Sequence, residues 1–224
     1  MSAVMGKYTN PKFEVVKTDY GLLVGAMRRT NDPDNVYWRI TQHIMPWYQM
    51  VPPFVLNSSP VEVSFITFWV PIDDHTHMSW LVVSDPLYAF SDPNRRYRFP
   101  FPETIPGTLI AKANRSNDYL IDREKQKSGK SFTGIPNVPA QDQAVTEGQG
   151  DGPIADRTKE RLGTSDTAII IARQVALHAI RDVQEGRNPP GVDAEAIRGL
   201  TAVSIVLPAN VPFVEGARPL LKSE

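Results

Sequence analysis

The densest cluster of potential metal ligands in the sequence is Asp73-Asp74-His75-Thr76-His77. On an extended chain His75 and His77 face the same side, and two imidazoles with one carboxylate can hold a divalent cation. The same residues also suit a polar hairpin turn, in which Asp and His side chains accept hydrogen bonds from the backbone. We favour the turn, because turn chemistry alone accounts for this composition.

A second candidate is the carboxylate pair Asp142 and Glu147, which lies in a short stretch of helical character. One carboxylate gains chemical interest when two histidines join it, as in the facial triad of non-haem iron oxygenases. His43 lies in a predicted strand and His178 on the polar stripe of a predicted helix, so we expect both to be surface or hydrogen-bonded histidines. From the residues alone, Asp142 and Glu147 are best interpreted as solvated charges.

Composition excludes several other chemistries. The 224 residues contain no cysteine, so the chain has no disulfide, thiolate zinc site, cysteine nucleophile or cysteine-held iron–sulfur cluster. It also has no P-loop, dinucleotide-binding glycine pattern, H-E-x-x-H or G-x-S-x-G motif. A net charge of -1 argues against binding to nucleic acid or an anionic membrane. The sequence lacks a signal-like segment and a long apolar run, so we expect a cytoplasmic, soluble protein.

The elements that position these residues begin with antiparallel structure. Alternating apolar residues and turn signals predict strands at residues 13–17, 20–29, 36–44, 61–70 and 78–83. The strand at 61–70 has bulky side chains on both faces: Val63, Phe65 and Trp69 on one, and Ile66, Phe68 and Val70 on the other. Such a strand is covered on both sides or lines an apolar cavity.

Prolines interrupt the pattern from residue 85 to 163, where we expect an irregular excursion with one short helix near 141–147. The clearest helix is predicted from Asp166 to Glu185, with Ser165 or Asp166 as the N-cap and Gly186 after its end. We expect the segment 154–166 to be an ion-paired loop that anchors the start of this helix.

A short helical turn at 193–200 and an apolar run at 202–207 follow, and the tail from residue 208 carries little signal. Many antiparallel strands followed by one long amphipathic helix predict an α+β fold with the helix packed across a curved sheet.

Several motifs resemble the C-terminal catalytic domain of Rieske-type aromatic-ring oxygenases, in the branch of phthalate dioxygenase and dehydrodivanillate O-demethylase. They are Gln141-Asp142-Gln143-Ala144, the run G-P-I-A-D-R-T-K-E-R-L-G-T-S-D at 152–166, Ala172-Arg173, the hairpin at 70–76 and the early strands at 13–46. The resemblance implies a helix-grip fold, in which a curved antiparallel sheet wraps a long C-terminal helix and a substrate cavity lies between them. It also implies a single domain over residues 1–224.

By this resemblance Asp142 matches the carboxylate of the family's mononuclear Fe(II) site, whereas Asp73, Asp74 and His75 match a turn that the family does not use for iron. The family's [2Fe–2S] cluster needs C-x-H and C-x-x-H pairs in an N-terminal Rieske domain, and its two iron-binding histidines precede the early strands. Neither segment has a counterpart here, so we expect part of an oxygenase that is inactive alone.

The implied reaction is ring hydroxylation or O-demethylation with O2 of an aromatic acid or an aryl methyl ether. The implied partners are a reductase or ferredoxin, the N-terminal oxygenase half and a homotrimer. One alternative is a stand-alone helix-grip domain that binds a hydrophobic ligand without catalysis, based on the apolar faces of strand 61–70. Another is an interaction module that uses the 85–163 excursion.

Overall fold

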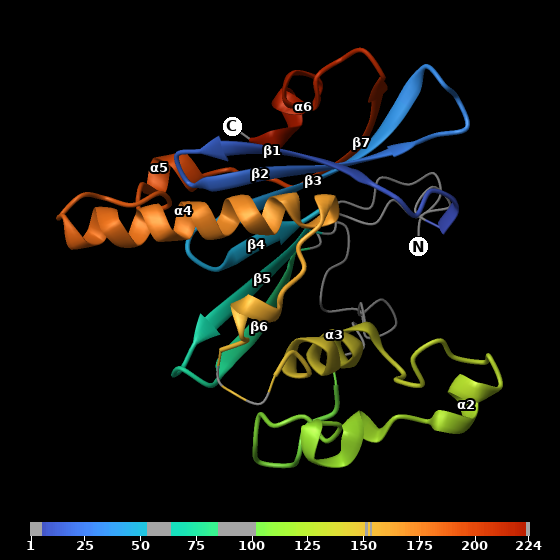
Figure 1. Ribbon diagram of the computed structural model, residues 1–224. Helices are drawn as coiled ribbons and strands as arrows, with labels where there is room; N and C mark the ends of the chain where they lie inside the picture. The colour runs from blue at the N-terminus through green and yellow to red at the C-terminus, as the bar shows by residue number, and fades with distance from the viewer. Residues whose placement is uncertain (1–5, 53–63, 85–101, 151, 153, 223–224) are drawn as a thin grey trace. The chain divides into compact units, whose positions relative to one another are not determined.

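The structure is a computed structural model that describes residues 6–52, 64–84, 102–150, 152 and 154–222 (Figure 1). Its residues group into two compact units. The first unit contains Met1–Asp73, His77–Ala89 and Arg161–Glu224, and the second contains Asp74–Thr76 and Phe90–Glu160. The second unit thus takes up most of the excursion expected at 85–163.

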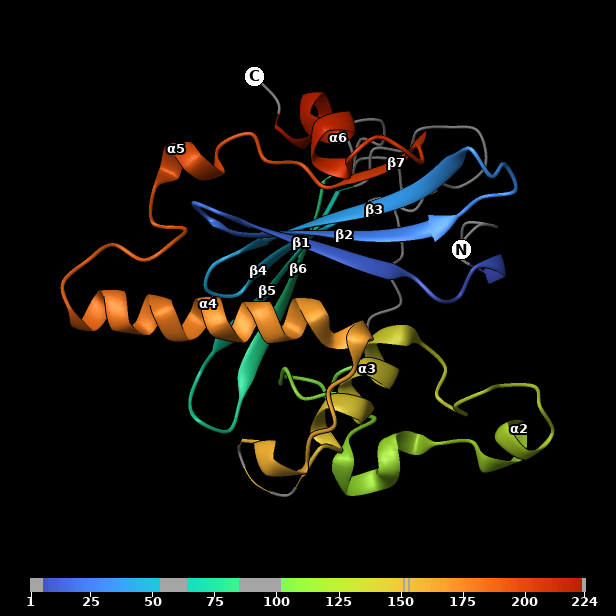
Figure 2. The same ribbon diagram turned by 45° about the horizontal axis from the view of Figure 1, so that its top comes forward.

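The first unit is built on a seven-stranded antiparallel sheet with the order β1-β2-β3-β4-β5-β6, in which β7 also pairs with β3. The strands are β1 (Lys12–Thr18), β2 (Gly21–Arg29), β3 (Asn35–Ile44), β4 (Tyr48–Val51), β5 (Ser64–Pro71), β6 (His77–Ser84) and β7 (Val203–Pro208). On one side of β3, residues 35–40 pair with β7 and residues 42–44 pair with β4. The sheet therefore splits at β3, and β5 and β6 run at a steep angle to β1 and β2 (Figures 1 and 2).

Helices cover both faces of the sheet. The helix α6 (Phe213–Leu221) packs on the face that carries Leu23 and Trp38, which we call the α6 face. Trp38 stacks on Phe213 with ring centroids 4.8 Å apart. The stack requires glycine at position 25, because a Cβ there would lie 2.9 Å from the Trp38 ring and 3.1 Å from Phe213.

The long helix α4 (Thr167–Gln184) lies along β1 and β2 on the opposite face, which we call the α4 face (Figure 1). Its buried Val175 and Ala179 pack with Leu22 and Met45. The helix ends at Gln184, and Gly186 just beyond it has a φ of 74°, the left-handed conformation that glycine adopts freely. The predicted α+β helix-grip fold and the end of its long helix are confirmed.

Two elements were not expected from the sequence. The strand β4 has four residues, which is too short for a clear alternation. The helix α6 contains Pro219, which argues against a helix, but Phe213, Ala217 and Leu221 recur at a spacing of four and are all buried. The tail after residue 208, which carries little signal in the sequence, therefore forms part of the core.

The strand expected at 61–70 is described from Ser64 onward, and its first residues, Val63 among them, lie outside the described part of the chain. Phe65 is buried as expected, but Trp69 is 40% exposed. The same apolar face is therefore covered at one end of β5 and open to solvent at the other. The apolar run at 202–207 forms β7, and the turn at 193–200 contains α5 (Ala194–Ile197).

The second unit contains more helix than predicted: η1 (Arg115–Leu120), α2 (Arg123–Lys127), α3 (Val138–Glu147) and η2 (Arg157–Lys159). Capping residues, and not a periodic pattern of apolar side chains, determine where these helices begin. Asn137 Oδ1 accepts a hydrogen bond from the Ala140 N–H at 2.9 Å, so α3 begins before residue 141. Asp122 caps α2 in the same way, at 2.9 Å from the Lys125 N–H.

No helix within the described residues is both long and apolar enough to cross a membrane.

Candidate functional site

Asp142, the carboxylate singled out by the resemblance, lies on the exposed side of α3. The opposite side of the helix carries Ala140, which is 2% exposed and packs with Tyr119 and Ile135. The backbone oxygen of Asp142 accepts a hydrogen bond from Thr146 Oγ1 at 2.7 Å. The carboxylate therefore projects from a helix whose other side is fixed.

Glu147, the second carboxylate, holds α3 against the rest of its unit. Its Oε2 accepts a hydrogen bond from the Tyr119 hydroxyl at 2.7 Å, and its Oε1 accepts one from Gln143 Nε2 at 2.8 Å. Burial raises the pKa of Tyr119 to about 12, and the hydrogen bond and charge of Glu147 act in the same direction. Glu147 is therefore a structural partner and not only the solvated charge that its residue type suggested.

The turn that carries Tyr119 has an unusual backbone. Asp118, Tyr119 and Leu120 have φ values of 51°, 54° and 50°, so three successive residues with side chains are left-handed. Each such residue costs about 1–2 kcal/mol relative to the right-handed form. Packing of Tyr119 against α3 and its hydrogen bond to Glu147 offset this cost.

The described residues do not complete an iron site around Asp142. No group of three His, Asp or Glu side chains within them could hold a metal ion. His178 is exposed and its Nδ1 lies 2.7 Å from the Gln174 carbonyl, as expected for a surface histidine. One carboxylate does not hold Fe(II) by itself, so the residues present do not fit the complete mononuclear centre.

His43 differs from its expected role. It is half-buried on β3, and its Nδ1 is buried without a hydrogen-bond partner in the described part of the chain. Burial lowers the pKa of His43, because the charged imidazolium is disfavoured away from water. His43 is therefore not a surface histidine, and its Nδ1 has no hydrogen bond within the described residues.

The cluster at 73–77 lies at the tip of the β5–β6 hairpin, where all five side chains are exposed. Asp73, His75 and Thr76 all have interaction partners. Strand β6 begins at His77, which pairs with Pro71 across the hairpin. The cluster thus has the predicted position of a polar turn.

A polar row on the α4 face was not anticipated from the sequence. Strict alternation along β3 places Tyr37, Arg39, Thr41 and His43 on that face. Arg28 lies directly opposite Tyr37 on β2, on the same face as Leu22 and Val24. Two guanidinium groups thus share the face of the sheet on which α4 packs.

The surroundings of the two arginines differ. Arg39 Nη2 donates to the Pro52 carbonyl oxygen at 3.0 Å. Burial lowers the pKa of Arg39; the Tyr37 hydroxyl opposes this shift, and the nearby charge of Arg28 adds to it. Arg28 has its Nε and Nη1 buried with no hydrogen-bond partner among the residues that the structure describes. Two buried, unpaired N–H groups on a cation are costly and point to an external acceptor.

One sequence signal could have identified this row. Residues 37, 39, 41 and 43 are polar at a spacing of two, within a strand whose other face (Trp38, Ile40) is strongly apolar. Polar side chains on the covered face of a helix-grip sheet are candidates for ligand contacts.

The loop at 154–166 contains the ion pairs expected of it. Arg157 contacts Glu160 at 2.5 Å, and Lys159 contacts Asp156 at 3.4 Å. Asp166 occupies the N-cap position of α4, but its carboxylate accepts from the Gly163 N–H at 2.8 Å and does not cap the helix. The predicted N-cap position is right, and its predicted hydrogen bond is replaced by one that fixes the loop.

The chain is similar to two oxygenase subunits of known dioxygenases. The chain is 31% identical over 205 residues to the 3-chlorobenzoate-3,4-dioxygenase oxygenase subunit of Comamonas testosteroni, covering 84% of this chain and 46% of that protein. It is 33% identical over 201 residues to the phthalate 4,5-dioxygenase oxygenase subunit of Pseudomonas putida, covering 84% of this chain and 42% of that protein. The chain thus spans less than half the length of these two relatives.

A family model described as LigXa C-terminal domain like matches residues 6–214. The resemblance indicated by the motifs around Asp142 and at 152–166 is confirmed, and the chain belongs to the LigXa C-terminal domain-like family.

Proposed function

We propose that this chain is the substrate-binding part of a Rieske-type oxygenase that acts on an aromatic acid in the cytoplasm. In this proposal the electron donor would be a reductase or ferredoxin, and the [2Fe–2S] cluster would be held by another segment or polypeptide. A mononuclear Fe(II), held in part by Asp142, would supply the O2 chemistry for ring hydroxylation or O-demethylation. The chain contributes Asp142 as one iron ligand and the α4 face of the sheet as a substrate contact.

The observation that carries the proposal is that Arg28, beside Arg39 on the α4 face, has its Nε and Nη1 buried with no hydrogen-bond partner within the described residues. A carboxylate is the acceptor that best matches a guanidinium, because both are planar and can form two parallel N–H···O bonds. A bound carboxylate would also relieve the repulsion between Arg28 and Arg39. The matched relatives are named for 3-chlorobenzoate and phthalate, which are both aromatic carboxylates.

The residues of this chain would act mainly by orientation. Arg28, with Arg39 beside it, would fix the carboxylate end of the substrate and so the position of its ring. Apolar side chains on the same face, such as Val24, would exclude water from the ring. Holding the reacting ring in one geometry lowers the entropic part of the barrier.

Substrate recognition can be tested on the chain alone. We expect phthalate and 3-chlorobenzoate to shift the backbone NMR signals of residues 22–28 and 37–43. Arg28→Gln should weaken this binding about tenfold or more, because it removes a charge-assisted hydrogen bond. Asp142→Ala should leave this binding unchanged. Equal affinity of wild type and Arg28→Gln would contradict the assignment of Arg28.

The iron ligand is tested separately. A single carboxylate binds iron weakly, so we expect the chain, after dialysis against metal-free buffer, to retain no stoichiometric Fe(II) and to show no turnover. Co-expression with a segment that provides two histidines should restore iron, and Asp142→Ala should abolish that gain. Stoichiometric iron in the dialysed chain alone would contradict the proposal.

The alternative of a stand-alone hydrophobic-ligand carrier rests on the half-buried Ile66 and Phe68 of β5. It predicts that toluene binds as tightly as benzoate, and that neither Arg28→Gln nor Asp142→Ala changes ligand affinity. A marked preference for the carboxylate would exclude it.

A further inference from the structure

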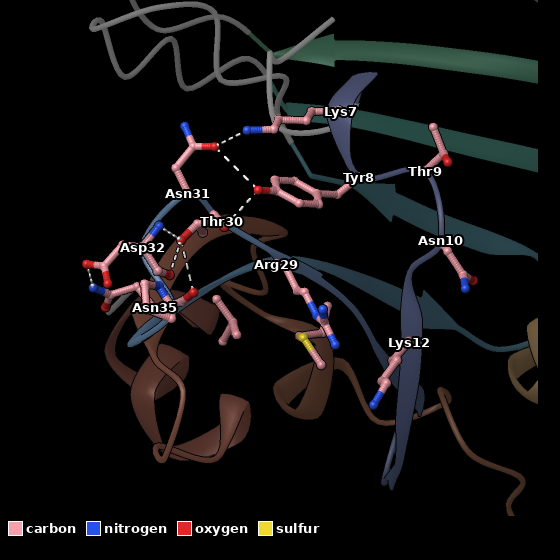
Figure 3. A pocket seen from close by; sticks show the side chains of 13 residues that line it. Lys7, Tyr8, Thr9, Asn10, Lys12, Arg29, Thr30, Asn31, Asp32 and Asn35 are labelled. Atoms are coloured by element: carbon pink, nitrogen blue, oxygen red, sulfur yellow. Dashed lines mark hydrogen bonds between the residues drawn. The ribbon is translucent and has the colours of Figure 1, made fainter.

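A pocket of about 920 Å³ lies on the α6 face, between residues 7–12 and the turn that joins β2 to β3 (Figure 3). Register places it on the opposite side of the sheet from Arg28. Lys12 pairs with Met27, which in turn pairs with Trp38 of the α6 face. Arg29 is two residues beyond Met27 and therefore shares this face. The pocket is thus separate from the substrate contacts proposed above.

Hydrogen bonds hold the two walls of the pocket together. The Tyr8 hydroxyl donates to the Thr30 carbonyl oxygen at 2.9 Å, and Lys7 Nζ donates to Asn31 Oδ1 at 2.5 Å (Figure 3). Thr30 Oγ1 also donates to the Asn35 carbonyl oxygen at 3.0 Å within the turn. These bonds fix the pocket walls in the absence of a ligand, which lowers the entropic cost of binding.

The pocket is strongly cationic in a chain whose net charge is -1. Lys7, Lys12 and Arg29 line it, and Asp32 is the one carboxylate among the described residues of its lining. Both oxygens of Asp32 are used by the turn: Oδ1 accepts from the Asp34 N–H at 3.0 Å and Oδ2 from Asn35 Nδ2 at 2.7 Å. The hydrogen bond from Asp34 also lowers the pKa of Asp32, which keeps it ionised and bound to the turn.

Lys12 and Arg29 are available to an external anion. Neither side chain forms a hydrogen bond or ion pair with another residue in the described part of the chain. Two cations with free donors on neighbouring strands can together coordinate one oxyanion.

The pocket also has an apolar floor. Met27 and Val36 line it and pack at the same time against the core formed by Trp38, Leu207 and Phe213. An inorganic anion would leave this floor uncovered, whereas an anion with an apolar body would bury it.

We propose that this pocket binds a small organic carboxylate with an apolar body. Lys12 and Arg29 hold the carboxylate, and Met27 and Val36 contact the apolar part. Such a site would give the chain a second contact for aromatic acids, on the face of the sheet away from Arg28. Because the pocket is open and exposed, we expect an affinity on the order of millimolar for a ligand the size of benzoate.

An NMR titration with benzoate tests the site. We expect shifts at the amides of residues 7–12 and 29–36, and a loss of affinity of about tenfold or more in Arg29→Gln. Arg28→Gln is the matched control: it makes the same substitution one residue away on the other face, and should leave these shifts unchanged. Lys12→Gln provides a second variant should Arg29→Gln disturb the fold, as judged from the dispersion of its spectrum.

Titrations with acetate and inorganic phosphate show whether the pocket selects the apolar body of benzoate or binds any oxyanion. Benzoate binding at least several-fold tighter than both would support the proposed carboxylate with an apolar body. Equal shifts by all three anions, or shifts that Arg29→Gln and Lys12→Gln do not reduce, would overturn it. Absence of benzoate shifts at residues 7–12 and 29–36 would also overturn it. The proposed function is read from different amides, at 22–28 and 37–43, so either assignment can fail without the other.

Discussion

Arg28 and Arg29 are consecutive residues of β2 whose side chains lie on opposite faces of the sheet. Arg28 opposes Tyr37 on the α4 face, and Arg29 opposes Val36 on the α6 face. The first is half-buried, and its Nε and Nη1 have no hydrogen-bond partner in the part of the chain that the structure describes, whereas the second is exposed at the edge of a pocket. The two positions therefore carry the same group at very different energetic cost.

This difference predicts that Arg28→Met stabilises the ligand-free chain. The substitution keeps an unbranched side chain of similar length and removes a buried cation with unsatisfied donors, so we expect the free energy of unfolding to rise by about 1–3 kcal/mol. Arg29→Met, the control, should change it by less than about 0.5 kcal/mol. Urea denaturation measures both. A loss of stability in Arg28→Met would show that Arg28 is already paired in the free protein.

His43 predicts a loss of stability on acidification. Its folded-state pKa is lowered by burial, so the folded chain holds neutral His43 while the unfolded chain takes up a proton near pH 6.5. Its contribution is therefore complete at neutral pH and falls as the pH drops below about 6.5. Thermal unfolding of wild type and His43→Gln between neutral and mildly acidic pH checks this, since the variant should lose that part of the pH dependence. His178→Gln, at an exposed position, should retain it.

The raised pKa of Tyr119 predicts a change in stability at high pH. Its pKa of about 12 lies above the ordinary value of 10.0, so the folded chain retains the phenolic proton more tightly than the unfolded chain does. The stabilisation is present below about pH 10 and is lost as the pH rises through 12.

The measurement is the difference in tyrosinate absorbance between wild type and Tyr119→Phe. This difference isolates Tyr119, because the six other tyrosines of the seven in the chain are present in both proteins. It should change near pH 12. Glu147→Gln keeps the size of the partner and removes its charge, so it should lower that pKa. A Tyr119 that titrates near 10.0 in wild type would contradict the buried hydrogen bond.

Gly25→Ala should disrupt the core on the α6 face. The new Cβ would lie 2.9 Å from the Trp38 ring and 3.1 Å from Phe213, and neither ring can shift without disturbing their stack. We expect a loss of about 1–3 kcal/mol in the free energy of unfolding, as is typical of overpacking. Gly150→Ala is the control, because no atom lies within 4 Å of a Cβ there. Equal effects of the two substitutions would show that the change in the free energy of unfolding comes from the unfolded chain and not from contacts with Trp38 and Phe213.

The sequence was sufficient for the elements that have strong local signals. The strands from Lys12 to Ile44 follow from alternation and turn residues, and the long helix follows from apolar periodicity and Gly186. It was not sufficient for α6, where burial of Phe213 and Ala217 outweighs the helix-breaking tendency of Pro219.

The candidate site was predictable only in part. Asp142 was identified by resemblance and stays a prediction; the structure shows only that it is exposed on α3. Arg28 is of interest because, within the described residues, no hydrogen-bond acceptor contacts its Nε and Nη1. Only a folded structure can show this. Sequence alternation could assign Arg28 to a face but could not show that it lacks a partner.

Gln42, at the centre of β3, has a consequence for how the chain reaches its fold. Its side chain is 1% exposed, and its Nε2 donates to the carbonyl oxygens of Thr201 and Leu221, 159 and 179 residues later. The acceptors for this early amide are therefore synthesised long after Gln42 itself. Until then Gln42 and the apolar residues around it lack their native cover, so we expect slow, late folding and dependence on chaperones during synthesis.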